Sequence, residues 1–104
     1  MKALNYAIGY DTPLVRKIRQ LETYSVWRML VLNRDNFTCQ QCFLSGIKLH
    51  VDHFPESFAY LIIFNKIKSL KAAEKCNQLW NVKNGRTLCV DCHKMTKNYG
   101  RNYS

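Results

Sequence analysis

The sequence predicts a small α+β domain held together by a metal, and three observations lead to this expectation. Apolar residues recur at helical spacing from Thr12 to Asn33, and they alternate with polar residues from Ile47 to Phe54. One Cys-x-x-Cys pair lies between these two segments, and a second pair lies after them at residues 89–92. The chain of 104 residues, 47% of them hydrophobic, is long enough for one core and too short for two. We therefore expect a single domain over residues 1–104.

The N-terminal half is expected to hold helices and then a strand. Residues 12–33 are predicted to be largely helical, because Pro13 suits a first helical position and the apolar spacing continues beyond it. Ser25 is expected to cap a second, separate helix. Residues 47–54 have the alternation of a half-buried strand, which Pro55 stops because proline cannot continue a hydrogen-bonded ladder.

The C-terminal half is expected to add short helices, a second strand and a final helix. Residues 58–73 are apolar and then basic, which predicts one or two short helices. Asn84-Gly85 is a strong turn signal, followed by a short strand at residues 86–88. A helix from Val90 to Asn98, closed near Gly100, completes the order strand, excursion, strand, helix.

The charge of the chain favours a polyanionic partner. Lysine and arginine total 16 against 7 aspartate and glutamate residues, which gives a formal net charge of +9. Such a bias is typical of proteins that bind nucleic acid, and the basic residues recur along the whole length. A merely well-solvated surface is the alternative that charge alone leaves open.

No membrane segment or export signal is expected. The best apolar stretch, Phe58 to Phe64, is far shorter than the about 18 to 20 residues that a crossing requires. The first residues include polar Asn5 and Asp11 where a secretory signal would be apolar. We therefore expect a soluble protein in the reducing cytoplasm, where paired cysteines bind metals more often than they form disulfides.

The cysteine pairs predict a structural zinc site. Cys39 and Cys42 form one Cys-x-x-Cys pair and Cys89 and Cys92 the other, which is the spacing that lets two pairs enclose a tetrahedral ion. Buried thiols or a redox pair are the alternative, but two matched pairs rarely arise by chance. Cys76 stands alone and is expected to be a core thiol.

The surroundings of the cysteine pairs resemble the zinc-containing branch of the HNH nucleases. That family has Arg-Asp-x-(Phe/Tyr)-x-Cys-x-x-Cys, then (Asp/His)-His, then Asn-x-x-x-x-Cys-x-x-Cys-His. Arg34–Cys42, Asp52-His53 and Asn84–His93 match these motifs in order and spacing. The resemblance implies a ββα-metal (His-Me finger) core over residues 27–98, with residues 1–26 as an N-terminal helical extension.

The resemblance also implies a catalytic site that hydrolyses DNA. It makes His53 the general base, Asp52 and His93 the ligands of a catalytic cation, and Asn84 the support of the loop that positions the site. A histidine with a pKa near about 6.5 can accept a proton from the attacking water. Mg²⁺ or Mn²⁺ suits one carboxylate and one imidazole, although nickel or a second zinc could bind in vitro. The cation would stabilise the leaving 3′ oxygen.

Geometry sets a condition on this site. On a regular strand Asp52 and His53 point to opposite faces, so the strand must end or bulge there for both to reach one site. On the final helix Cys92 and His93 are about 100° apart, which lets one face the zinc and the other the catalytic cleft. His50 is expected to be a strand residue, either facing solvent or near the phosphate.

Several basic residues near the motifs are expected to hold the DNA backbone, and no base-reading element is recognisable. Two alternatives to a nuclease stay open: a non-catalytic zinc-knuckle module that binds nucleic acid, and a purely structural zinc domain that docks to a larger protein. The resemblance is compatible with a homodimer, and with phage packaging or mobile-element proteins as partners. The expected phosphate contacts are Arg34, Arg86, Lys94 and Lys97.

Overall fold

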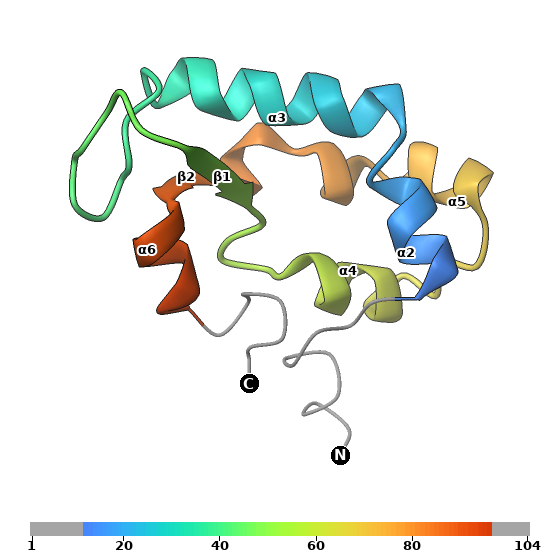
Figure 1. Ribbon diagram of the computed structural model, residues 1–104. Coiled ribbons are helices and arrows are strands. Elements are labelled where there is room, and N and C mark those ends of the chain that lie inside the picture. Colours follow the sequence, from blue (N-terminus) through green and yellow to red (C-terminus); the bar gives the residue numbers. More distant parts are fainter. Residues whose placement is uncertain (1–11, 97–104) are drawn as a thin grey trace.

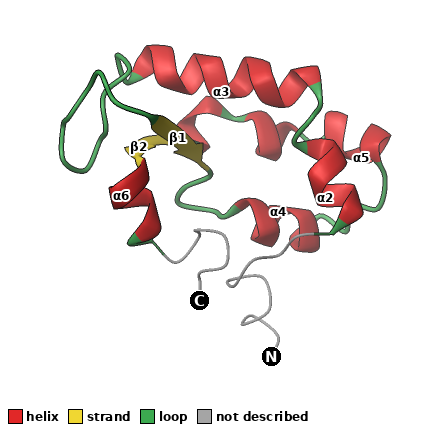
Figure 2. Cartoon of the chain, in the orientation of Figure 1, coloured by secondary structure: helices red, strands yellow, loops and turns green. Residues whose placement is uncertain are grey.

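The computed structural model describes residues 12–96 and confirms the expected α+β class. A two-stranded antiparallel sheet is surrounded by helices (Figures 1 and 2). None of the helices in residues 12–96 has the length and hydropathy of a membrane-spanning segment. In chain order the elements are α2 (Pro13–Ile18), α3 (Glu22–Arg34), β1 (Leu49–Asp52), α4 (Phe58–Phe64), α5 (Leu70–Glu74), the 3-10 helices η1 (Asn77–Trp80) and η2 (Val82–Asn84), β2 (Arg86–Cys89) and α6 (Val90–Lys94).

Local hydrogen bonds determine where the first two helices begin. Thr12 caps α2, because its side-chain oxygen accepts a hydrogen bond from the backbone of Val15 at 3.1 Å and Pro13 occupies the first turn. The cap expected at Ser25 is wrong: α3 already begins after extended Leu21, and Ser25 lies exposed inside it. Tyr24 N and Ser25 N both bond to the carbonyl oxygen of Leu21, which starts the helix one turn earlier. The expected boundary between residues 26 and 27 therefore falls inside a continuous helix.

The register of the sheet fixes which side chains share a face. His50 pairs with Leu88, and Asp52 pairs with Arg86. Residues two apart on a strand lie on one face, so His50 and Asp52 are on one side and Val51 is on the other. Val51 is buried against Trp27 of α3. The α3 side of the sheet is therefore buried, with Val51 paired to Thr87, and the opposite side carries His50, Asp52 and Arg86.

Strand β1 is shorter than the expected span of residues 47–54. Before it, Gly46 has a φ of +75°, and Thr38 forms an isolated bridge with Ser45, so that Ile47 belongs to the loop after the first cysteine pair. After it, the backbone N–H of Phe54 still donates to the carbonyl oxygen of Asn84, its partner in register, at 3.3 Å, but the N–H of Asn84 turns to the carbonyl oxygen of Asn81 at 2.9 Å and the ladder does not continue. Loop contacts at both ends thus limit the strand to four residues.

The excursion between the strands forms two short helices, as expected for residues 58–73. Each begins at a serine: Ser57 Oγ accepts from Tyr60 N at 3.0 Å, and Ser69 Oγ accepts from Ala72 N at 3.1 Å. These helices, α2 and η1 bury a common apolar cluster. Its fully or nearly fully buried members are Val15, Ile18, Phe58, Leu61, Ile62, Ile67, Ala73 and Leu79.

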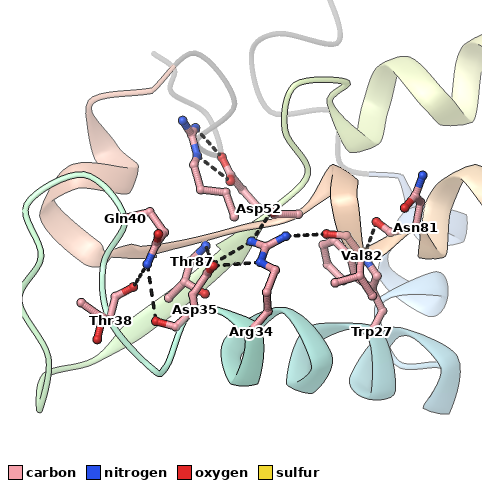
Figure 3. Close-up of polar contacts among 11 residues, drawn as sticks. Trp27, Arg34, Asp35, Thr38, Gln40, Asp52, Asn81, Val82 and Thr87 are labelled. Carbon is pink, nitrogen blue, oxygen red and sulfur yellow. Dashed lines mark hydrogen bonds and ion pairs between the residues drawn. The ribbon is translucent and has the colours of Figure 1, made fainter.

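Asn84-Gly85 leads into β2 without the tight hairpin turn that this pair often makes. Asn84 ends η2, and Gly85 is extended with a φ of −141°. A Cβ at Gly85 would lie 2.5 Å from Val31 and 2.8 Å from Trp27, so the glycine is required by close packing against α3. Trp27 is fixed there because its Nε1 donates to the carbonyl oxygen of Asn81 at 3.1 Å (Figure 3).

The sheet lies between two helices. Helix α3 runs along one side of it and α6 along the other (Figure 1), in agreement with the contacts of both helices with both strands. Helix α6 ends at Lys94, four residues short of the expected end at Asn98. Residues Asn98 and Gly100 lie outside the described part of the chain.

Candidate metal centre and the adjoining sheet face

The four cysteines of the two pairs converge on one point. Cys39 and Cys42 lie in the loop after α3, Cys89 is the last residue of β2, and Cys92 is in α6. Their sulfur atoms all lie within 4.8 Å of one another, and Cys42 Sγ is 3.8 Å from Cys89 Sγ. A tetrahedral zinc with Zn–S bonds of about 2.3 Å places its sulfurs about 3.8 Å apart. The cluster is therefore positioned to hold a metal such as zinc.

Backbone amides surround the cluster and favour thiolates. Gln41 N and Cys42 N point at Cys39 Sγ, and Cys92 N points at Cys89 Sγ, each at 3.4 Å. Burial raises the pKa of Cys39. Hydrogen bonds from the backbone of Cys42, Cys89 and Gln41 outweigh the burial and bring the pKa down to about 6. The hydrogen bond with Cys89 raises the pKa of Cys92 to about 12. Thiolates gathered this closely repel one another, and a bound divalent cation offsets this electrostatic repulsion.

Cys76 takes no part in the cluster. It packs against the apolar cluster formed by α2, α4 and α5, as expected of a core thiol. Within residues 12–96, the cysteine cluster is the only group of three or more His, Cys, Asp or Glu side chains arranged to hold a metal.

A pair of histidines lies on the sheet face next to the cysteine cluster. His50 Nδ1 of β1 is 2.8 Å from His93 Nδ1 of α6, and the two rings meet edge to face with centroids 5.0 Å apart. Because His93 follows Cys92 on the helix, one residue faces the sulfurs while the next reaches the sheet. Burial, and then the positive charges of Lys48, Arg28 and Lys94, lower the pKa of His50.

Burial, and then the charges of His50 and Arg86, lower the pKa of His93 to about 4. Both rings of the pair are therefore neutral at pH 7. Two neutral imidazoles whose Nδ1 atoms face each other need one N–H donor and one lone pair, so the contact holds a single proton.

Asp52 lies on the same face of the sheet but is bound to another partner. Arg86 Nη2 is 3.2 Å from Asp52 Oδ2, and Arg86 Nε is 3.4 Å from Oδ1. The guanidinium also lies 3.7 Å above the centre of the Phe54 ring. Burial raises the pKa of Asp52, and the neighbouring Arg86 partly offsets this. The structure thus places Asp52 and His93 on one side of the sheet, but it brings His93 to His50 and Asp52 to Arg86.

His53 does not lie on that side. The strand ends at Asp52, as the expected site required, yet the next ring turns toward α3. It stacks on Trp27 with centroids 4.0 Å apart, and it is only 3% exposed. Its Nε2 donates to the carbonyl oxygen of Leu79 at 2.9 Å. Burial lowers the pKa of His53 to about 4. The ring of His53 therefore packs in an aromatic slot on the α3 side of the sheet, whereas His93 contacts the opposite side through His50.

Asn84 joins the two ends of the excursion. Its Oδ1 accepts from Glu56 N at 2.9 Å, and its Nδ2 donates to Glu56 O at 2.8 Å. Together with the bond from Phe54 N, these contacts hold the loop that follows β1. The side chain is 8% exposed, so both of its polar atoms are used inside the protein.

The four expected phosphate contacts differ in their surroundings. Arg34 is used internally: it donates to Val82 O at 2.8 Å, to Gly85 O at 2.7 Å and to the Asp35 carboxylate (Figure 3). Arg86 is ion-paired with Asp52. Lys94 lies exposed on α6, and Lys97 lies outside the described residues. The position of Arg34 therefore assigns it to the scaffold, where it connects α3 to η2 and β2.

Two residues of this region were not singled out from the sequence for the roles that they have here. His50 forms a pair with His93, and strand alternation could have indicated this, since His50 is two residues from Asp52 on the same face. Asp35 accepts hydrogen bonds from Arg34 and from the backbone of Thr87, and no local pattern indicates the second of these partners. No protein-family model matches the chain, and searches of curated proteins and of solved structures give no significant match.

Proposed function

We propose that this chain is a zinc-stapled, metal-dependent endonuclease that hydrolyses DNA. The observation that supports this most is the cysteine cluster, which joins the loop after α3 to the junction of β2 and α6. In α6, directly after that junction, His93 contacts His50 on the sheet face that also carries Asp52. The order strand, excursion, strand, helix around paired cysteines is the one implied by the resemblance to the HNH nucleases.

The chain's own residues supply a setting for phosphodiester chemistry on this face. His93 offers a ring nitrogen, Asn84 holds the loop after β1, and the net charge of +9 favours approach of a polyanion. A cation bound at His93 would stabilise the negative charge that develops on the leaving 3′ oxygen. The resemblance makes His53 the general base, and the bond from its Nε2–H to the carbonyl oxygen of Leu79 fixes the tautomer in which Nδ1 carries the proton-accepting lone pair.

The test is cleavage of supercoiled plasmid by zinc-loaded protein with Mg²⁺ or Mn²⁺. We expect nicked or linear products, and we expect His93→Ala to lower the rate by at least about 100-fold while retaining one zinc. The variant His53→Ala checks the base: unchanged cleavage would remove His53 from the mechanism. Absence of cleavage by the wild-type protein with any divalent cation would refute the nuclease proposal.

A second function is favoured by a specific observation. The Asp52 carboxylate is ion-paired with Arg86 and His53 is buried, an arrangement that a zinc-knuckle module binding nucleic acid without cutting it could also have. This alternative predicts salt-sensitive binding of DNA with no cleavage under any metal condition. The plasmid assay, run beside a binding assay on the same preparation, separates the two.

A further inference from the structure

The His50–His93 pair has nearly the spacing of two ligands on one metal ion. Metal–nitrogen bonds of about 2.0–2.1 Å place neighbouring imidazole nitrogens about 2.8–3.0 Å apart in an octahedral site and about 3.3–3.4 Å apart in a tetrahedral site. The two Nδ1 atoms are 2.8 Å apart. The observed separation therefore suits neighbouring positions of an octahedral cation, and a tetrahedral cation would need an opening of about half an ångström.

The elements that carry the pair are fixed independently of it. His50 lies within the β1–β2 ladder, opposite Leu88. His93 follows Cys92, whose position is set by the cysteine cluster. Two ligands held in place by a sheet and by a metal-stapled helix lose little freedom on binding, which is the usual condition for a preorganised site.

Asp52 is not a competing ligand in this arrangement. Its two oxygens face Arg86, and no third His, Cys, Asp or Glu joins the two histidines among residues 12–96. A cation held by two imidazoles keeps its other coordination positions open for water or phosphate oxygens. Lys48, Arg28 and Lys94 lie near the pair and disfavour a bare cation there, so an anionic co-ligand such as phosphate suits the site.

We propose that His50 and His93 together bind a second divalent cation through their Nδ1 atoms, beside the metal of the cysteine cluster. Two nitrogen ligands favour first-row transition metals such as Ni²⁺ or Zn²⁺ over Mg²⁺, which prefers oxygen. His50 therefore takes the place that the resemblance gives to Asp52. The proposal that this pair binds a metal does not depend on any catalytic activity of the protein. The use of that metal in DNA cleavage rests on the proposed function.

The experiment titrates Ni²⁺ into full-length protein whose cysteine cluster is already loaded with zinc, using isothermal titration calorimetry. We expect one Ni²⁺ per chain, with zinc content unchanged by metal analysis after the titration. His50→Ala and His93→Ala should each weaken this binding at least 10-fold, and His50→Gln should do the same while preserving size. Asp52→Asn is the matched control and should retain the site.

The results separate this proposal from the nuclease. Ni²⁺ binding that depends on Asp52 but not on His50 would overturn the assignment, and so would the absence of a second equivalent in the wild-type protein. Binding that depends on His50 and His93, without cleavage by any metal, would support this site and refute the nuclease. Cleavage unaffected by His50→Ala would support the nuclease and refute a role for this pair in it.

Discussion

At the scale of single residues, His53 illustrates how burial decides the chemistry of a histidine. Its ring lies between Trp27 and Phe58, with centroid distances of 4.0 and 5.0 Å. The Leu79 carbonyl oxygen accepts a hydrogen bond from Nε2, so the proton of the neutral ring is already used inside the fold. Protonation would place a charge in an apolar slot, which explains why burial lowers the pKa to about 4.

The lowered pKa of His53 predicts a specific acid sensitivity. The unfolded chain takes up a proton near pH 6.5 and the folded protein only near pH 4, so stability is present above pH 6.5 and is lost as the pH falls between these values. This group alone should reduce the free energy of unfolding by about 2 kcal/mol between pH 8 and pH 5. Chemical denaturation of wild-type protein and His53→Leu at both pH values measures the effect. The variant cannot titrate, so an equal loss in both proteins would contradict the prediction.

At the scale of secondary-structure elements, Asp35 connects the end of α3 to β2. Its Oδ2 accepts from the backbone N of Thr87 at 3.0 Å, and both of its oxygens accept from Arg34 at 2.8 Å. Burial raises the pKa of Asp35, but the bonds from Arg34 and Thr87 outweigh it, so the pKa is lowered. The carboxylate is therefore charged, and it joins Arg34 at the end of α3 to the strand that leads to Cys89.

Removal of this carboxylate should destabilise the fold. Asp35→Ala leaves the N–H of fully buried Thr87 without its acceptor, and we expect a loss of about 1–3 kcal/mol in the free energy of unfolding. Asp35→Asn keeps an acceptor oxygen and should lose less. Urea denaturation of the zinc-loaded proteins measures both, with exposed Asp91→Ala as the control for a lost acidic residue. Similar losses for Asp35→Ala and Asp91→Ala would show that the connection is unimportant.

The elements also show what local sequence can and cannot predict. Cysteine spacing is local chemistry, because each pair forms its own turn, and all four cysteines predicted to form a metal site do gather. The helix from Glu22 and the strand around Val51 follow from apolar periodicity. The side reached by His53 depends on a slot formed by Trp27, which is distant in sequence, and the partner of Asp52 depends on strand register. No local sequence pattern indicates the position of the His53 ring or the partner of Asp52.

At the scale of the whole molecule, the two ends of the fold are stabilised differently. The cluster around α2, α4 and α5 contains eight buried apolar residues. At the other end the buried cluster consists of Cys39, Leu88 and Cys89, two of which belong to the candidate metal site. That end has little apolar surface to keep it folded without a cation.

Metal removal should therefore unfold one end of the molecule first. Treatment with a chelator is expected to expose the amides of residues 38–52 and 86–96 to hydrogen exchange, while α2, α4 and α5 keep their protection. Hydrogen exchange with mass spectrometry resolves these segments. Cys39→Ser should reproduce the pattern without chelator, whereas Cys76→Ala should not. A uniform loss of protection across the chain would show that the fold has no such division.

The net charge of +9 predicts how the whole molecule should bind DNA under the proposed function. Each lysine that neutralises a phosphate contributes about 0.9 to the slope of log K against log salt concentration. Lys94 is exposed on α6 beside the His50–His93 pair, so Lys94→Ala should reduce the slope by about 0.9. Lys66→Ala, on the turn after α4, should leave it unchanged. Fluorescence anisotropy with a labelled duplex at several salt concentrations gives both slopes, and equal reductions would mean that binding is spread over the surface without preference for this face.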